Sequence, residues 1–480
     1  MSVHAVDLAV IGAGPAGLAA ALAATGAGLT VALVDAAPRP GGQYWRSPAP
    51  TAGPFRPQAL HHGWRRFTAT WRRLDGLAAT GRLLPLFAHH AWSIQPDTDR
   101  WDVHCQVGAE PRQPETTAGV TVRARRLVLA PGAYDRQLPF PGWDLPGVLT
   151  AGGAQSLLKG HLVVAGTTAV VAGTGPFLLP VATGLARHGA RVAAVVEANT
   201  PLSLARSPGA WPAAAGKLGE AAGYATRLAR HRVAVRHRHI VIRAEGTDRL
   251  TGVLVGRLDR DGRVLDGTVR HIPCDLLTVG WGFTPQLELP LQAGCATRLD
   301  ADASLVVAVD DRQATSVAGV FAAGEATGVG GADLATVEGR IAGLAAAASL
   351  GAATPDDRAL RRRRTTLRAF AAALHRAYPV PEALLDLCGD DTLVCRCEEV
   401  DAGAIRHAVE ELGAAEARTV KLLARPGMGW CQGRVCGFAT ACLTARYAGR
   451  PLAEPDLQAF AQRPIATPIP LAALADLADG

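Results

Sequence analysis

Aromatic residues and lysine are scarce in this 480-residue sequence, which has only 10 Phe and 5 Tyr against 53 Gly. A chain of this length with 49% hydrophobic residues can bury a large core and divide into two or three domains. Abundant glycine permits close backbone approaches, which suit a nucleotide-binding α/β protein better than an aromatic-rich sandwich. The composition therefore favours a globular α/β protein.

Lysine stands only at positions 159, 217 and 421, so the formal net charge of +7 comes almost wholly from arginine. The densest basic run, Arg361 to Arg364, has no interleaved aromatic residues and no nucleic-acid-binding motif around it. A solvated helix face explains this run better than contact with nucleic acid or lipid does. We expect no nucleic-acid partner.

The N-terminus lacks the basic segment, the apolar segment and the small-residue cleavage site of an export signal. The longest apolar stretch, 162–186, reaches membrane-spanning length but is interrupted by glycine and proline. A strand, a glycine turn and a helix start fit this stretch better. We therefore expect no transmembrane segment and a cytoplasmic protein with reduced thiols.

Two segments share one plan: an apolar strand, a glycine turn, an apolar helix, and a second strand that ends in an acid. The first has its strands at 7–11 and 29–34, a helix to about residue 25, and Asp35 as its acid. The second has its strands at 169–172 and 191–196, a helix to about residue 188, and Glu197 as its acid. Between them, short strands around 86–94, 101–107 and 120–129 predict an antiparallel insertion.

In the first turn, Gly12 permits the tight turn, Gly14 lets a pyrophosphate approach the backbone, and Gly17 lets helix and strand pack closely. Pro15 and Ala16 begin the helix, whose N-terminus faces the phosphates. The Asp35 carboxylate can accept hydrogen bonds from ribose hydroxyls and disfavours a 2′-phosphate. This turn therefore predicts dinucleotide binding.

The second turn, Gly173-Thr174-Gly175-Pro176, has Leu178 at the third glycine position. This departure weakens the dinucleotide prediction, although Glu197 would select NAD over NADP. NAD(H), another adenine nucleotide, and a purely structural remnant all remain open for this pocket.

No CxxC pair occurs in the second unit or near the first glycine turn, although disulfide reductases need two neighbouring thiols to relay electrons. Five cysteines are isolated and are expected to be small core residues. They are Cys105, Cys274, Cys295, Cys388 and Cys442.

Four other cysteines form two pairs, Cys395-Arg396-Cys397 and, 33 residues later, Cys431 with Cys436. Clustered thiolates hold zinc or an iron–sulfur cluster, and a CxC pair is unusual for structural zinc. A [2Fe–2S] cluster is therefore favoured, with zinc or unliganded cysteines as alternatives and Cys388 and Cys442 as reserve ligands. The sequence between the pairs predicts a helix over 402–412 and an extended piece over 420–423.

Three further segments resemble those of two-domain flavin-dependent pyridine-nucleotide:disulfide-type oxidoreductases. They are Gly41-Gly42-Gln43, Ala130-Pro131-Gly132-Ala133 and the distant Gly324-Glu325. The resemblance implies FAD in the first unit, with Gly324 and Glu325 near the ribityl chain and pyrophosphate. An aspartate usually follows this glycine in that group, so Glu325 is a departure. The cysteine module resembles the bacterioferritin-associated ferredoxin-like [2Fe–2S] domain, which often spaces its second pair as CxxC.

Nearly the whole chain resembles the alpha-type subunits of opine oxidases, hydrogen cyanide synthase, heteromeric proline and D-hydroxyproline dehydrogenases, and sarcosine oxidase. The motifs that carry this resemblance lie at 10–17, 41–43, 140–148, 175–176, 323–325, 395–400 and 427–434.

The resemblance implies that a separate D-amino-acid-oxidase-like beta subunit oxidises an amine or amino acid, while this chain passes the electrons onward. It also implies, in some members, an interfacial FMN and a small ferredoxin-like subunit. Two other hypotheses are a stand-alone NADH-dependent acceptor reductase and a non-catalytic redox-sensing or assembly module.

The predicted fold class is α/β, with two Rossmann-like nucleotide-binding domains and a small C-terminal iron–sulfur domain. Residues 1–155 and 287–350 are expected to form the FAD-binding domain, and 156–286 the second nucleotide-binding domain. The rest is expected to divide into a helical connector, 351–390, a [2Fe–2S] domain, 391–450, and a C-terminal tail, 451–480.

Overall fold

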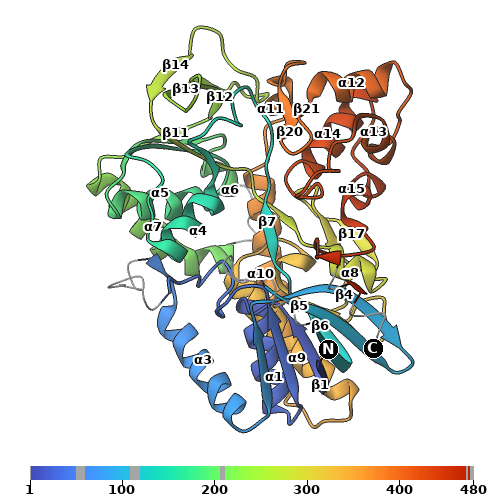
Figure 1. The fold of residues 1–480 in the computed structure, drawn as a ribbon. Coiled ribbons are helices and arrows are strands. Elements are labelled where there is room, and N and C mark those ends of the chain that lie inside the picture. The colour runs from blue at the N-terminus through green and yellow to red at the C-terminus, as the bar shows by residue number, and fades with distance from the viewer. Residues whose placement is uncertain (1, 50–59, 109–118, 206–210, 472–473, 476–480) are drawn as a thin grey trace.

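A computed structural model describes residues 2–49, 60–108, 119–205, 211–471 and 474–475 (Figure 1). The first sheet is built around β1 (Ser2–Ile11), which pairs in parallel with β2 (Val31–Asp35) and β6 (Gly119–Leu129). The strand β3 (Leu83–Phe87) extends this sheet beside β2, and β19 (Val320–Ala322) pairs with β6. The chain therefore returns to its first sheet after the whole second unit has been built.

Two helices pack closely on this sheet, α1 (Pro15–Gly26) and α9 (Ala332–Ser349). A side chain at Gly339 or Gly343 would collide with the backbone of α1. Small residues therefore set the spacing between these helices and bring the start of α9 next to the first glycine turn. The helix α3 (Trp64–Ala79) also contacts α1. The sheet continues with β5 (Arg100–Val107), which is antiparallel to β6, and β4 (His89–Asp97), which is antiparallel to β5.

The sequence predicted one strand over 86–94, but the structure divides this stretch between β3 and β4. Ala88 lies between them with a positive φ of 55°. The chain leaves one edge of the sheet there, where β3 pairs in parallel with β2, and β4 forms the other end of the strand order, antiparallel to β5.

The second sheet has the order β11-β10-β9-β15-β8 and is wholly parallel. Its strands are β8 (Val148–Thr150), β9 (Thr168–Gly173), β10 (Arg191–Glu197), β11 (Ala234–His237) and β15 (Leu276–Gly280). The pairing of β8 with β15 places 148–150 in this second sheet, whereas the predicted division at residue 155 assigned them to the first domain.

Helices α4 (Ala151–His161), α5 (Leu178–Arg187), α6 (Leu202–Ala205) and α7 (Trp211–Arg230) complete this unit together with a small antiparallel sheet. That sheet consists of β12 (His239–Glu245), β13 (Gly252–Arg257) and β14 (Arg270–Pro273). A two-stranded ribbon of β7 (Ala133–Asp135) and β16 (Phe283–Pro285) joins the two units. Beyond it come α8 (Glu288–Gln292), β17 (Thr297–Leu299), β18 (Leu305–Val307) and the 3-10 turn η3 (Gly324–Thr327).

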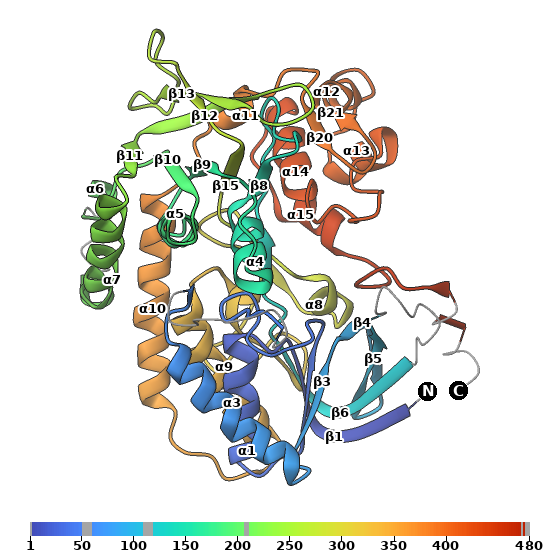
Figure 2. The same cartoon turned by 60° about the vertical axis from the view of Figure 1, so that its left-hand side comes forward.

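The connector helix α10 (Arg358–Ala377) runs along both nucleotide-binding units, contacting α9 below and α6 and α7 above (Figure 2). The prediction of a solvated arginine face on this helix is wrong in part, because Arg364 and Arg368 pair with the fully buried Glu338 of α9. Arg361 bonds to Asp311 and Asp357. These ion pairs hold α10 in place.

The C-terminal module begins after α11 (Ala383–Asp386) and contains β20 (Leu393–Cys395), β21 (Val400–Asp401) and four helices. The helices are α12 (Ala402–Glu410), α13 (Ala417–Ala424), α14 (Gly437–Tyr447) and α15 (Glu454–Ala461). The extended piece predicted over 420–423 is therefore wrong. Ala417 and Val420 are fully buried at helical spacing, and this packing selects the helix.

The part of the module from β20 to α14 shares a hydrophobic core with the second unit, whereas α15 and the tail after it pack against the first sheet through Leu457, Phe460 and Ala466. In Figure 1 the module, drawn in orange to red, stands beside the second unit and above the first. Of the helices in the described ranges, none is both long and apolar enough to cross a membrane.

Candidate functional site

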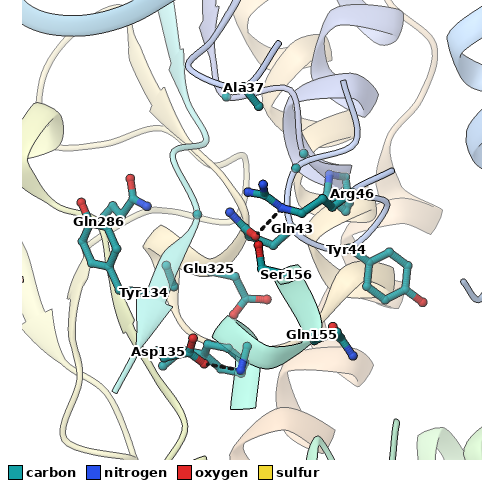
Figure 3. A pocket seen from close by; sticks show the side chains of 18 of the residues that line it. Ala37, Gln43, Tyr44, Arg46, Tyr134, Asp135, Gln155, Ser156, Gln286 and Glu325 are labelled. Carbon is teal, nitrogen blue, oxygen red and sulfur yellow. Dashed lines mark hydrogen bonds between the residues drawn. The ribbon is translucent and has the colours of Figure 1, made fainter. Parts of the chain in front are cut away.

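A cavity of about 1430 Å³ lies where the first unit, the helices α4 and α5, and the cysteine module meet. Every residue predicted to bind FAD lines it, apart from Gly17. These residues are Gly12, Gly14, Pro15, Ala16, Asp35, Gly42, Gln43, Ala130, Gly132, Gly324 and Glu325. Figure 3 shows Gln43, Glu325 and Tyr134 around this cavity. Segments far apart in the sequence thus form one wall.

The glycines of the first turn serve two different purposes. A side chain at Gly12, whose φ is +102°, would collide with the Ala130 carbonyl, and one at Gly17 would collide with the Gly12 carbonyl. Gly14 has an ordinary φ of −75°, and a Cβ there would meet only the Gly42 Cα, at 3.9 Å. The protein itself requires Gly12 and Gly17, whereas Gly14 leaves free the space that a pyrophosphate occupies in such turns.

The Asp35 carboxylate is fixed against the same turn. It accepts hydrogen bonds from the backbone N–H groups of Ala13 and Ala37, the latter at 2.7 Å. Burial raises the pKa of this carboxyl, and these two bonds act against the rise. Since each carboxylate oxygen can accept more than one hydrogen bond, Asp35 still has capacity for ribose hydroxyls at the cavity wall.

The distal turn is held by the predicted Glu325 and by Glu338, which the sequence analysis did not single out. Glu338 accepts hydrogen bonds from the Gly324 N–H and the Thr327 hydroxyl, both at 3.1 Å, and pairs with Arg368 at 2.8 Å. Glu325 accepts from the N–H groups of Gly330 and Gly331 at the start of α9. The available signal for Glu338 was a carboxylate in the interior of an Ala-rich helix, because such a charge must find partners when it is buried.

The second glycine turn is occupied by the chain's own residues. Glu197 accepts hydrogen bonds from the N–H groups of Gly175 at 2.8 Å and Asn199 at 2.9 Å, and burial raises its pKa to about 7. The Asn199 amide donates to the Pro379 carbonyl at 2.8 Å, and the Thr174 hydroxyl donates to the Tyr378 carbonyl at 3.3 Å.

Tyr378 lies directly over this turn, since its Cβ is 3.9 Å from the position of a Cβ on Gly175. Among the described residues that line the large cavity, none is Gly173, Gly175, Pro176 or Glu197. The connector between α10 and α11 therefore packs against this turn.

The four cysteines of the C-terminal module come together as two pairs. The thiols of Cys395 and Cys436 hydrogen-bond to each other, and so do those of Cys397 and Cys431. The Gly427 N–H also points at the Cys395 sulfur at 3.5 Å. The bond to Cys436 is the main cause that lowers the pKa of Cys395 to about 5.

This paired arrangement suits two metal atoms better than one. Structural zinc draws four thiolates around one ion, whereas a [2Fe–2S] cluster takes two thiolates on each of two irons. The donor set therefore fits the cluster. Of the reserve ligands, Cys388 instead directs its thiol to the Pro139 carbonyl, at 3.3 Å.

The loop that carries the second pair reaches both the cavity and the surface. Trp430, Cys431 and Arg434 line the cavity together with the residues predicted to bind FAD. Trp430 is 84% exposed, and Cys397 is also exposed. The tail, in which no chemical motif was found, contributes Ala466, Thr467 and Pro468 to the cavity wall.

Comparison with known proteins gives matches along nearly the whole chain. The family model for pyridine nucleotide-disulphide oxidoreductases matches 6–351, and that for the BFD-like [2Fe–2S] binding domain matches 393–442. The A subunit of opine oxidase from Rhizobium meliloti (strain 1021) is 33% identical over 98% of this chain and 99% of its own length. The HcnB subunit of hydrogen cyanide synthase from Pseudomonas protegens is 31% identical over 89% of each chain.

Two solved structures show the same fold at low sequence identity. L-Proline dehydrogenase from P. horikoshii is 20% identical, with a TM-score of 0.69 over 98% of this chain and 80% of that one. Thioredoxin reductase from T. acidophilum is 19% identical, with a TM-score of 0.51 over 73% of this chain and 100% of that one.

Proposed function

The chain belongs to the pyridine nucleotide-disulphide oxidoreductase family and has a BFD-like [2Fe–2S] binding domain, and we propose that it is the electron-transfer subunit of a heteromeric amine or amino-acid dehydrogenase. The predicted fold class and the resemblance to opine oxidase A subunits are confirmed. The protein is an FAD-dependent oxidoreductase with a [2Fe–2S] domain.

One observation carries this proposal: the FAD-binding loops and the cysteine loop line a single cavity. FAD exchanges either a hydride or single electrons, whereas a [2Fe–2S] cluster exchanges one electron at a time. In the proposed arrangement, the first glycine turn and Asp35 hold the dinucleotide, Gly324 and Glu325 flank it, and Cys395, Cys397, Cys431 and Cys436 hold the cluster. The cavity then brings the two groups together on one chain.

The oxidation of the amine is assigned to another polypeptide. The relatives are named as subunits, namely the A subunit of opine oxidase and the alpha subunit of sarcosine oxidase. We propose that the partner is a D-amino-acid-oxidase-like beta subunit; an interfacial FMN and a small ferredoxin-like subunit are features that the resemblance implies for some members of the family only. None of the nine cysteines, all of which lie in the described ranges, forms a disulfide, which supports a location in the reducing cytoplasm.

Replacing Trp430 by alanine should weaken binding of the beta subunit about tenfold. A tryptophan that is exposed in the free subunit and becomes buried at the centre of an interface contributes more than about 1 kcal/mol to binding. Trp430, which precedes Cys431, lines the cavity where it opens to the surface, and it is 84% exposed. Iron and flavin contents should stay unchanged. The measurement is the dissociation constant of the two subunits by calorimetry.

Leu202→Ala is the matched control, since Leu202 is 74% exposed but lies on α6, in the second unit. Equal affinity of the Trp430 variant and the Leu202 variant would remove the cysteine loop from the proposed interface.

The alternative of a stand-alone NADH-dependent reductase needs an accessible second turn. Because Tyr378 and Pro379 pack against that turn and Glu197 is engaged there, we propose that the second unit has a structural role. NADH, added anaerobically, should therefore leave the flavin spectrum unchanged.

Dithionite is the control in this titration, since it should bleach both the flavin and the cluster. Prompt bleaching by NADH would establish the reductase and overturn a structural role of the second unit. A cluster that reports redox state but never exchanges electrons with the flavin would favour the redox-sensing or assembly module.

A further inference from the structure

A buried ion pair stands between the flavin-binding cavity and the cysteine loop. Arg434, which lies between Cys431 and Cys436, pairs through Nε with Glu288 Oε1 at 2.9 Å. Their side chains are only 18% and 8% exposed. The same Nε donates to the Tyr134 hydroxyl at 2.7 Å, and this hydroxyl donates to Glu288 at 3.2 Å.

The two charges belong to different parts of the molecule. Arg434 also donates to the Cys431 carbonyl at 3.3 Å and to the Ala466 carbonyl, so the cation is tied to the cysteine loop. Glu288 begins α8 and Tyr134 lies on β7, so their groups belong to the wall of the FAD-binding domain. All three residues line the cavity.

A buried ion pair is weak support for stability, because desolvating both charges costs about as much as their attraction returns. Its position here has an electrostatic consequence instead. A cluster that accepts an electron gains one negative charge on the loop that carries Arg434. A cation close to that loop favours the reduced form, and an anion close to it favours the oxidised form.

We propose that Arg434 and Glu288 are positioning residues that set, in opposite directions, how readily the cluster accepts an electron from the flavin. This inference rests on the proposed function, because it requires a cluster on Cys395, Cys397, Cys431 and Cys436. With FAD and the cluster bound as proposed, the two electrons of a reduced flavin would pass to the cluster one at a time, with no bond formed or broken between the two groups. The electrons that reduce this flavin would come from the amine oxidised on the partner subunit of the proposed complex.

The test uses the purified, cluster-containing chain and the variants Arg434→Gln, Glu288→Gln and the double variant. The midpoint potential of the cluster is measured by a redox titration monitored by electron paramagnetic resonance. Arg434→Gln should lower the potential and Glu288→Gln should raise it, each changing the electron distribution on the order of tenfold, as one unit charge does at short range in a protein. The double variant should lie between the two.

Tyr134→Phe is the matched control, because it removes the bridging hydroxyl and leaves both charges in place. Its potential should stay close to that of the unsubstituted protein. A purely structural role would shift the potentials of all variants alike or none of them, and either result with the cluster intact would overturn the inference.

A second readout covers the case in which Arg434→Gln does not fold. Glu288→Gln alone should still raise the potential, and its failure to do so with a full iron content would overturn the inference. If the unsubstituted protein contained no iron and gave no resonance signal on reduction, the proposed function itself would fail, and this outcome is distinct from an unshifted potential.

Discussion

Replacing Gly14 by alanine should give a folded protein that purifies nearly free of FAD and retains its iron and sulfide. Gly14 has an ordinary φ of −75°, and its Cβ would meet only the Gly42 Cα at 3.9 Å, so the fold tolerates the methyl group. That methyl group would project into the space where the pyrophosphate approaches the backbone. We expect FAD affinity to fall on the order of a hundredfold, about 2.7 kcal/mol.

The measurement is the ratio of flavin absorbance to protein, followed by FAD titration of the flavin-free protein. Gly26→Ala is the control on the same helix, since a Cβ at Gly26 would meet nothing within 4 Å. This control should keep its full flavin content. A Gly14 variant with undiminished flavin would remove the first glycine turn as the FAD site.

Gly12→Ala should destabilise the folded protein itself, and not only weaken the binding of FAD. Its Cβ would collide with the Ala130 carbonyl, and its φ of +102° suits only glycine among ordinary residues. The melting temperature of the flavin-free protein should therefore fall for this variant and stay unchanged for Gly14→Ala. The contrast distinguishes a glycine that the fold requires, Gly12, from one that the ligand requires, Gly14.

The first turn could be predicted from the sequence because its constraints are local. The strand, the three glycines, the helix start and Asp35 lie within one short segment, and each is dictated by neighbours along the chain. The return of Gly324 and Glu325 to this turn was available through the resemblance alone, since the whole second unit separates them from Asp35 along the chain.

The contacts between distant segments could not be predicted. Arg434 stands 300 residues from Tyr134, and no periodic pattern relates an arginine in a cysteine loop to a tyrosine on a short strand. The contact of Tyr378 with the second turn could not be predicted for the same reason. The hydropathy pattern of the connector predicts a helix but not which residues the end of that helix contacts. In α13, the short apolar run was compatible with either a strand or a helix, and burial of Ala417 and Val420 selected the helix.

Substituting serine for Cys395 or Cys436 should abolish the iron–sulfur cluster while leaving the flavin bound. These two sulfurs form the buried pair, at 1% and 2% exposure, so no water-exposed side chain can replace them. Iron–sulfur clusters need soft thiolate ligands, which a serine hydroxyl does not supply. The expected result is near-complete loss of iron, acid-labile sulfide and the resonance signal of the reduced protein, with an unchanged flavin ratio.

Cys388→Ser is the matched control for this pair. Cys388 is also buried, but its thiol hydrogen-bonds to the Pro139 carbonyl at 3.3 Å, a bond that a hydroxyl can keep. This variant should therefore retain the full iron and sulfide content. Equal loss of iron in all three variants would mean that burying a hydroxyl in this module disrupts it in general. Zinc in place of iron in the unsubstituted protein would instead identify a structural metal site. The module could then not accept electrons from the flavin, because zinc has no redox chemistry.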